Sequence, residues 1–518
     1  MARRMDSRAP IPPSRVVLTE ESSLSFQERA EFAEATAGFA PLMRKPLRRS
    51  KEALPVAEET DPEQVLNRQD LMAAPVVGSL GPAAPPPLSP PPSLVLDGLA
   101  DDGTAIPPDT MGAVGHDHLF NPLNTGVLIS DRTGAHALPV VRLNDFWKSL
   151  ADPIEAFDPR AAYDPFNRRF LFACVADAES PASSLLLGVT KGDDPTRDWT
   201  LTRVRVDPAV QGNVWLDFPS IGFSADKITV QVNLFAIADN SFQGSSVYVW
   251  DKASLYNPPF APAVQMFLLP DQGATQAPAL TYDPAQSAQF LVSRWSSDSQ
   301  GAGSYAIYEI TGQVSDGSLR LARTGFVVTP GTIWDPGTAG DFAPQNGIPQ
   351  LINAGDDRIL SVVYRDSSLW FCHTVFLPSG GPVRTAAQWL QVASGTWSVQ
   401  QLGRVDDPTG GTFFAFPTIA VNSEEDALIG LARFAAGDFA SGAYVYRNHA
   451  DAPGRMQPPL RFAPGQNSYF KTFGGTRNRW GDYSATQVDP LDDHGFWTLQ
   501  EYAAPNPNTW ATKWAQIP

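Results

Sequence analysis

Short apolar runs separated by turn-forming residues extend from residue 93 to the C-terminus. The runs have the length of strands, and clusters of Gly, Pro, Asp and Asn lie between them. This pattern predicts β-strands joined by tight turns. The 518-residue chain contains 48 Pro and 40 Gly, which argues against a helical bundle. We therefore expect an all-β fold over residues 93–518.

A weak repeat runs through this region. Each copy starts with a small-residue strand at a Pro, Ser or Thr anchor, passes a polar turn and returns in an apolar strand, as in AFPTIAVNSEEDALIGLARF at 415–434. The spacings of 49 to 71 residues allow four strands each. The anchors are Thr110, Pro159, Pro219, Pro278, Pro349, Pro417 and Ser484. Radial repetition of such units predicts a β-propeller, most simply of seven four-stranded blades, with six or eight as alternatives.

The last unit is one strand short. After Ser484 the chain has room for three strands, which end in TWATKWAQI. The segment SLVLDGL at 93–99 precedes the first anchor and can supply the missing outermost strand. We expect it to pair with the C-terminal blade and close the ring, because an open sheet edge would otherwise remain.

Residues 1–92 differ in composition from the rest of the chain. They contain few aromatic residues and end in the proline-rich run GPAAPPPLSPPPS at 81–93, which is typical of an extended spacer. We expect a mostly disordered arm that solubilises or tethers the protein, or alternatively a docking peptide. Ser25 and Glu28 form a capping-box pattern, which predicts one short helix ending at Gly38.

The amino-acid composition limits the classes of binding partner that we expect. With 38 basic and 55 acidic side chains the formal charge is −17, so we expect no nucleic-acid partner. No apolar stretch is long enough to span a membrane. Cys174 and Cys372 lie in separate apolar runs, and we expect two buried free thiols. The N-terminus MARRMDSRAPIPPSR has no apolar segment typical of a secretory signal. We expect a monomer without a cofactor, and the compartment stays open.

Two terminal motifs carry a family resemblance. The segment IPPDTMGAVGHDHL near the start and RWGDYSATQVDPLDDHGFWTLQEY near the end resemble a group of uncharacterised bacterial propeller proteins, similar in plan to sialidase-like and WD40-like propellers. The resemblance implies a propeller fold and suggests an exported protein. The Asp boxes and the Arg-Ile-Pro element of true sialidases are absent, which argues against sialidase activity.

Three arginines occupy the same place in successive repeats. Arg294, Arg365 and Arg433 each lie sixteen residues beyond their anchor. If they converge, their planar guanidiniums could bind a carboxylate or sulfate of a substrate. The alternative is that each arginine pairs with an acid of its neighbouring blade.

Carboxylates gather where the innermost strands are expected to start. They are Asp109, Asp158, Asp217 and Asp482, and Glu501 lies in the returning strand of the last unit. Glycoside hydrolysis needs two carboxyl groups on either side of the scissile bond, so Asp482, Glu501, Asp109 and Asp158 are candidate catalytic residues. Alternatively, the aspartates cap strand starts by accepting backbone N–H groups.

The stretch GQNSYFKTFGGTRNRWGDY at 465–483 is the strongest candidate binding loop. It combines local positive charge with aromatic residues, so Arg479, Trp480 and Tyr483 could contact an acidic sugar. Alternatively, the loop simply covers the ring closure.

Metal-binding signals are weak. His116 and His118 would share one face of a strand, but no third ligand is identifiable. Asp489, Asp492 and Asp493 could hold calcium, although a structural turn fits their place in the repeat better. We therefore predict no metal site.

Two functions remain open. The first is a carbohydrate-active enzyme, a glycoside hydrolase or lyase acting on an acidic glycan at the mouth of the ring. The second is a non-catalytic propeller that binds a glycan or a protein. Propellers host both uses, so the fold cannot decide. Paired carboxylates in a deep pocket would favour the enzyme, and a shallow, salt-bridged mouth would favour the binding protein.

Overall fold

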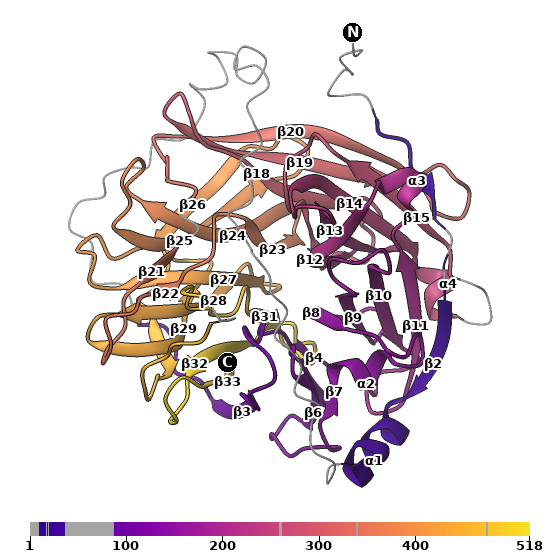
Figure 1. The fold of residues 1–518 in the computed structure, drawn as a ribbon. Helices are drawn as coiled ribbons and strands as arrows, with labels where there is room; N and C mark the ends of the chain where they lie inside the picture. Colours follow the sequence, from indigo (N-terminus) through magenta and orange to yellow (C-terminus); the bar gives the residue numbers. More distant parts are fainter. Residues whose placement is uncertain are drawn as a thin grey trace.

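The computed structural model describes residues 10–16, 18, 20–36, 88–257, 262–337, 340–472 and 475–518. The described part is all-β apart from four short helices, and its sheets radiate from a common centre (Figure 1). This arrangement is that of the predicted propeller. We call each radial set of strands a blade and name it after its innermost strand.

Consecutive strands of each blade run antiparallel from the centre toward the rim. The β4 blade holds β4 (Ala113–Val114), β5 (His118–Pro122), β6 (Gly126–Asp131) and β7 (Val141–Arg142). The β8 blade holds β8 (Ala156–Asp164), β9 (Arg169–Ala176), β10 (Ser184–Thr190) and β11 (Asp198–Arg205). The β12 blade holds β12 (Val214–Phe223), β13 (Lys227–Ala236), β14 (Phe242–Asp251) and β15 (Val264–Leu269).

The remaining blades follow the same plan. The β16 blade holds β16 (Ala277–Pro278), β18 (Gln289–Ser299), β19 (Ala302–Thr311) and β20 (Arg320–Pro330). The β23 blade holds β23 (Ile359–Arg365), β24 (Ser368–Leu377), β25 (Arg384–Ala393) and β26 (Val399–Val405). The β27 blade holds β27 (Phe413–Val421), β28 (Ala427–Ala435), β29 (Asp438–Arg447) and β30 (Leu460–Ala463). The β31 blade holds β31 (Ala485–Val488), β32 (Phe496–Ala503) and β33 (Trp510–Ile517).

A few short elements connect the blades. Strand β17 (Leu280–Thr281) lies parallel to both β12 and β23, and β21 (Asp341–Ala343) pairs with β22 (Ile352–Asn353). The short helices between strands are α2 (Leu143–Trp147), α3 (Pro208–Gln211) and α4 (Lys252–Tyr256). We call the side where innermost strands begin the strand-start face, and the side where the first hairpin of each blade turns the hairpin face.

The repeat anchors mark β-bulges at the start of innermost strands. The register shifts just before Arg160, Ser220 and Thr418, next to three of the predicted proline anchors. The residue ahead of the proline has a positive φ: 52° at Asp158, 51° at Phe218 and 53° at Phe416. A bulge bends the strand and redirects one side chain, so these positions aim their side chains toward the neighbouring blade.

The predicted anchor Pro349 is wrong as an innermost-strand start. Residues 352–353 form β22, and the innermost strand of this blade is β23. The segment predicted to be a returning second strand is therefore the first strand, and four strands still fit because 399–405 supplies β26. This shift moves Arg365 to the hairpin face.

The predicted ring closure is confirmed. Strand β3 (Leu94–Ala100) pairs antiparallel with β33, with Leu94 opposite Gln516 and Leu96 opposite Trp514. Inside this seam, Asn121 of the β4 blade accepts a hydrogen bond from Leu99 N at 3.0 Å and donates one to Met111 O at 2.9 Å. One buried amide thus ties the closing strand to the first blade.

The N-terminal segment is ordered where the structure describes it. Ile11 bridges to Leu321, β1 (Ser14–Arg15) pairs with β15, and β2 (Glu20–Ser25) pairs with β11. These contacts follow the rim in Figure 1 and cover strand edges that would otherwise lack partners. The expected disorder of residues 1–92 therefore does not hold for residues 10–16 and 20–36, and the stretch 37–87 lies outside the described residues.

The predicted short helix is present as α1 (Phe26–Thr36), and Glu28 N donates to Ser25 Oγ at 3.5 Å. The predicted end at Gly38 lies outside the described residues. Phe26 is fully buried and packs on Phe146 of α2, with ring centroids 6.0 Å apart. The helix therefore fastens the N-terminal segment to the β4 blade.

Both cysteines are buried free thiols, as predicted. Burial raises the pKa of each thiol well above its usual range. Among the described helices, none is long and apolar enough to cross a membrane.

We predict that Asn121→Ala weakens the ring closure. The substitution leaves Leu99 N and Met111 O buried without their partner, which typically costs about 1–3 kcal/mol of the free energy of unfolding per group. Urea unfolding measures this loss. The exposed Asn506 serves as the control, because Asn506→Ala removes an amide of the same size from the surface. Equal unfolding midpoints for the two variants would contradict the role of Asn121.

We also predict that Phe26→Ala releases the N-terminal segment from the rim. Removing a fully buried phenylalanine typically costs about 3–5 kcal/mol, so β2 should detach from β11. Hydrogen–deuterium exchange should then accelerate at the β11 amides that face β2. Phe166→Ala is the matched control, because Phe166 is exposed. Unchanged exchange in β11 would show that the segment does not depend on this anchor.

Candidate functional site

Two of the predicted catalytic aspartates connect neighbouring blades. Asp109 Oδ1 accepts a hydrogen bond from Asp482 N at 3.2 Å, and Asp158 Oδ2 accepts one from Phe218 N at 3.1 Å. Both side chains are buried at the strand-start face. These contacts match the alternative prediction that the aspartates satisfy backbone N–H groups where innermost strands begin.

Arg160 lies among these carboxylates. It is buried, and its Nε donates to Pro219 O at 2.7 Å. Its guanidinium carbon lies 3.3 Å from the ring centroid of Tyr483 and 4.9 Å from that of Phe218. Burial lowers the pKa of Arg160, and the negative charge of nearby carboxylates, Asp158 first among them, opposes this. The ring of Tyr483 is therefore covered by an arginine and is closed to a sugar.

The structure also buries Trp480. Its ring makes edge contacts with Phe434 at 5.6 Å and with Tyr469 at 5.0 Å, measured between centroids. Only 1% of the residue is exposed. The expectation that Trp480 stacks on a ligand therefore finds no support in the geometry, because the apolar loop residues pack into the core beneath the loop.

Arg479, Asp482 and Glu501 do come together. Arg479 Nη2 donates to Asp482 Oδ1 at 2.8 Å, and Gly481 N donates to Glu501 Oε2 at 2.9 Å. Burial raises the pKa of Glu501 well above its usual range, and the negative charges of Asp109, Asp101 and Asp482 add to this. The protonated form of Glu501 is therefore favoured by its surroundings. Among the described residues, its Oε1 has no hydrogen-bond partner.

Asn478 holds the backbone between the two arginines of the loop. This buried residue donates its N–H to both oxygens of Asp341 at 2.9 and 2.8 Å. Its side chain donates to Leu351 O and Tyr469 O and accepts from Lys471 N. The polar contacts therefore fix the positions from which Arg477 and Arg479 project.

The two arginines lie within electrostatic range of each other. Burial lowers the pKa of Arg477 to about 10, and the positive charge of Arg479 contributes to the decrease. Asp482, Asp356 and Asp341 oppose the shift without cancelling it. Two cations held close together in a partly desolvated place favour a bound anion.

A further ion pair extends this cluster. Arg358 Nε donates to Asp356 Oδ1 at 2.7 Å, and its guanidinium carbon lies 4.0 Å from the ring centroid of Phe218. Arg358 is also within electrostatic range of Asp482. We call the partly exposed set Asp341, Asp356, Arg358, Arg477 and Asp482, together with Arg479 behind it, the mouth cluster.

The three repeat arginines do not converge. Arg294 Nε lies 3.1 Å from Asp357 Oδ2 of the approach to β23, and Arg433 pairs with Asp438 of its own hairpin. Arg365 projects from the end of β23 on the hairpin face, where its Nη1 donates to Asp493 Oδ1 at 2.8 Å. Each arginine is thus engaged by an acid, but only Arg294 pairs with an acid of the neighbouring blade, as the alternative prediction had it. The equivalence of Arg365 with the other two is wrong because of the strand shift.

The weaker metal signals have structural explanations. His116 Nδ1 lies 2.7 Å from Tyr163 Oη, and His118 Nε2 lies 3.9 Å from Asp194 Oδ1. Asp489 accepts from Trp497 Nε1 and Leu491 N, and Asp492 accepts from His494 N and Gly495 N. These aspartates therefore stabilise the turn that the sequence predicted.

Two cavities bear on the site. A cavity of about 60 Å³ runs down the centre, lined by Arg160 and by small residues of the innermost strands such as Gly112, Ser220 and Ser484. This volume is far below the roughly 300 Å³ of the smallest ligand pockets. The centre of the ring is therefore packed, and a ligand can meet only the mouth.

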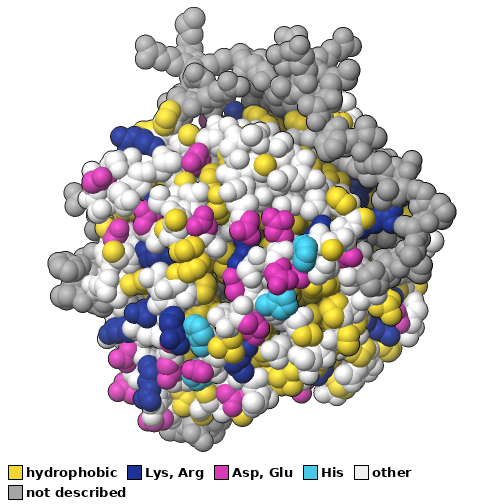
Figure 2. Space-filling model, turned by 180° about the vertical axis from the view of Figure 1, so that it is seen from behind, with side chains coloured by type: hydrophobic (Ala, Val, Ile, Leu, Met, Phe, Trp, Pro, Cys, Tyr) yellow, Lys and Arg dark blue, Asp and Glu magenta, His cyan; other side chains and the backbone are white. Residues whose placement is uncertain are grey.

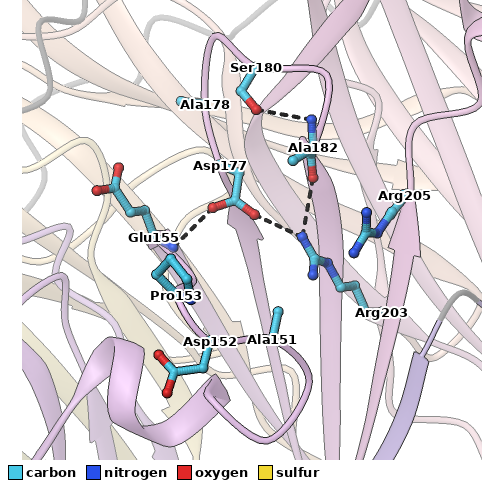
Figure 3. A pocket seen from close by; sticks show the side chains of 10 residues that line it. All are labelled: Ala151, Asp152, Pro153, Glu155, Asp177, Ala178, Ser180, Ala182, Arg203 and Arg205. Carbon is cyan, nitrogen blue, oxygen red and sulfur yellow. Dashed lines mark hydrogen bonds and ion pairs between the residues drawn. The ribbon is translucent and has the colours of Figure 1, made fainter.

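A larger pocket of about 500 Å³ lies outside the centre, between the β4 and β8 blades (Figure 3). Its buried Arg203 donates to Asp177 Oδ2 at 2.8 Å and to Ser184 Oγ at 2.9 Å, and pairs with Glu20 of β2 at 3.1 Å. Figure 3 shows Asp177 reaching both Glu155 N and Arg203. The guanidinium is already held by the protein, so this pocket offers little to a ligand.

Arg477 lies in the predicted binding loop 465–483, where it was one of the positive charges expected to contact an anion. Sequence reasoning missed the other residues of this region, namely Asp341, Asp356, Arg358 and Asn478. The sequence has the pattern Arg-Asn-Arg at 477–479, and an asparagine between two arginines could have indicated a loop held by side-chain hydrogen bonds. The partners Asp341 and Arg358 come from a different part of the chain, and no local pattern joins them to this loop.

Comparisons with known proteins concern the fold alone. No protein-family model matches the chain, and no curated protein matches it. Among solved structures, it is similar to a protein of unknown function from Dyadobacter fermentans, at 10% identity and a TM-score of 0.36 over 70% of this chain and 95% of that one. It is also similar to the Hadza microbial sialidase (8%, TM-score 0.35, 77% and 73% covered) and to the Dos1 propeller (10%, TM-score 0.36, 77% and 75% covered). The structural neighbours are β-propellers, in agreement with the resemblance of the terminal motifs.

We predict that Glu501→Gln stabilises the protein above pH 5 and has little effect near pH 4. A carboxyl whose pKa is raised in the folded state stabilises that state fully below its unfolded pKa and loses this stabilisation as pH rises. The wild type should therefore lose at most about 1.4 kcal/mol of the free energy of unfolding per pH unit from this group, and the neutral amide should not. Thermal melting from pH 4 to 8 tests this, with the exposed Glu155→Gln as control. Parallel pH profiles for Glu501→Gln and the wild type would contradict a raised pKa of Glu501.

Proposed function

We propose that the protein is a non-catalytic, seven-bladed propeller that binds an acidic glycan at the mouth cluster. The sets of strands named after β4, β8, β12, β16, β23, β27 and β31 support a count of seven blades. The ligand site lies at the centre of the strand-start face, where loops of several blades meet. This is the usual place for a ligand on a fold whose channel is filled by side chains.

One observation carries the proposal: Arg477 and Arg479 flank a buried asparagine, and the positive charge of Arg479 contributes to a lowered pKa of Arg477. The pKa of Arg477 falls to about 10 because burial and the neighbouring cation both disfavour its charge. A ligand carboxylate or sulfate would relieve this repulsion and could accept from the planar guanidinium in a bidentate way. Because Asn478 already fixes the backbone, little further ordering is needed on binding.

The acidic members of the cluster suit the hydroxyls of a sugar. Asp356 and Asp482 are partly exposed, and their carboxylate oxygens can accept hydrogen bonds from ligand O–H groups. The mixture of cations and carboxylates therefore favours a polar ligand that carries both an anion and hydroxyl groups. An aliphatic acid would leave Asp356 and Asp482 without a partner in the ligand.

Binding without turnover is supported by the state of the carboxylates. Asp109 and Asp158 are buried and accept backbone N–H groups across blade boundaries. Hydrolysis needs two carboxyl groups on opposite sides of a bound glycosidic bond. The central cavity, of about 60 Å³, is too small for a sugar. Ion pairs such as Arg358–Asp356 and Arg479–Asp482 at the mouth of the ring are the arrangement expected of a binding protein.

A second candidate, glycoside hydrolysis, is favoured by the raised pKa of Glu501. A carboxyl with a raised pKa within electrostatic range of a second carboxyl, that of Asp482, is the arrangement that a general acid and its partner carboxylate require. Glu501 lies behind Gly481, however, and its Oε2 is engaged by that backbone. This candidate needs Glu501 to reach the ligand through a moved loop.

The first test is binding of acidic and neutral oligosaccharides to the full chain by calorimetry. We expect sulfated or uronate-containing oligosaccharides to bind and neutral ones to bind much more weakly. Arg477→Gln should weaken the acidic ligand about 10–100-fold, the value of one or two charge-assisted hydrogen bonds. Arg461→Gln is the matched control, because Arg461 is exposed and pairs with Asp438 away from the mouth. Equal affinities for acidic and neutral ligands would overturn the proposal.

Asp482→Asn separates the two candidates. Removing this negative charge should preserve or tighten the binding of an acidic ligand, because Arg479 and Arg477 lose a competing partner. Under the hydrolase candidate the same variant loses turnover by about 10²–10⁴-fold. Release of reducing ends by the wild type, and its loss in Asp482→Asn, would replace binding by catalysis as the function.

A further inference from the structure

A second group of polar side chains lies on the hairpin face, away from the mouth cluster. Figure 2 shows one side of the molecule on which several histidine side chains lie directly beside acidic ones. In the described residues, the group with the most metal-ligating side chains contains Glu424, Asp426 and His449. One potential ligand atom from each residue lies within 4.8 Å of the other two.

Asp426 is the fixed member of this group. Its carboxylate is buried, Oδ2 accepts from Tyr446 Oη at 2.6 Å, and Oδ1 accepts from His449 N at 2.6 Å. The imidazole Nδ1 of His449 lies 2.9 Å from the same Oδ1. Contacts of this kind hold a metal-binding carboxylate in place before the cation arrives.

A fourth side chain approaches from the next blade. His494 Nδ1 lies 3.8 Å from Glu424 Oε1. The turns that carry these two residues are joined directly, because Ser423 N and Oγ donate to Asp493 O and Asn422 Nδ2 donates to His494 O. The two imidazoles and the carboxylate of Glu424 are half exposed, so a cation can reach them from solvent.

We propose that Glu424, Asp426, His449 and His494 form a zinc site that joins the β27 and β31 blades. Two imidazoles and two carboxylates suit Zn²⁺, which takes four nitrogen, oxygen or sulfur ligands about 2.0–2.2 Å away for nitrogen and oxygen. Calcium and magnesium take oxygen ligands and would leave both histidines unused. Glu424, His449 and His494 are half exposed, so their side chains are free to rotate toward a cation held by Asp426.

Binding has a defined proton balance. Zn²⁺ takes the neutral form of each imidazole, so a proton on the coordinating nitrogen of His449 or His494 leaves to solvent as the metal–nitrogen bond forms. The hydrogen bond between His449 Nδ1 and Asp426 is then replaced by coordination of one or both atoms. No electron is transferred, and no other reactant is needed.

The other histidines on this side lack this combination. His116 Nδ1 is engaged by Tyr163 Oη and lies 3.2 Å from Asp193, which Arg168 also contacts. His118 has Asp194 at 3.9 Å. Among the described residues, neither joins a group of three ligands. They therefore serve as internal controls for weak histidine–metal contacts.

The experiment titrates zinc chloride into the metal-free full chain by calorimetry. We expect one saturable zinc per chain and a higher Tm in its presence, because a ligand that binds only the folded state stabilises it. His449→Ala, His494→Ala and Glu424→Gln should each weaken binding by about 10–100-fold or more. Zinc-edge X-ray absorption should report two imidazole ligands.

Two matched controls make the result decisive. His118→Ala and His136→Ala remove histidines outside the site and should leave zinc binding unchanged. Loss of binding in His118→Ala, unchanged binding in both His449→Ala and His494→Ala, or no saturable binding would each overturn the proposal. Calcium of equal affinity would overturn the assignment to a transition metal.

Discussion

The pairing of β3 with β33 is the contact on which the rest of the architecture depends. It joins segments far apart in sequence: Thr512 Oγ1 donates to Leu99 O across 413 positions. The pairing places the β4 blade beside the β31 blade, where Gln487 accepts a hydrogen bond from Val114 N and donates one to Gly112 O. The contact between Asp109 and Asp482 N crosses that seam, as does the ion pair of Lys471 with Asp101. The mouth cluster therefore lies beside the ring closure, and its geometry depends on the pairing of β3 with β33.

Charge at the centre of the ring follows from the bulges of the innermost strands. At the β8 bulge the residue ahead of the proline is Asp158, whose carboxylate reaches Phe218 N of the next blade. A buried carboxylate needs such a donor, and the positive charge of Arg160 lies within electrostatic range of it. Asp109 and Asp158, which the sequence suggested as catalytic residues, thus connect neighbouring blades. The residues left partly exposed above them carry the ligand chemistry.

The sequence could predict what depends on local pattern. Alternating apolar runs and proline anchors indicated the strands, and the strand missing after Ser484 indicated the closure. The prediction failed where an insertion changed the register, since residues 335–353 add β21 and β22 before β23 and so displace Arg365. It also could not place Trp480, because exposure depends on Phe434 and Tyr469 folding over it. Burial and long-range pairing are tertiary properties that no local spacing encodes.

The N-terminal segment along the rim has a consequence for the order of folding during synthesis. Ile11, β1 and β2 are synthesised long before their partners in β20, β15 and β11. Strand β3 likewise waits for β33, since Leu99 and Thr512 are 413 positions apart. The N-terminal strands can pair with β11, β15 and β20 as each of these emerges, but the ring cannot close before β33 is made. A growing chain therefore carries an exposed sheet edge during that interval, and such edges favour aggregation.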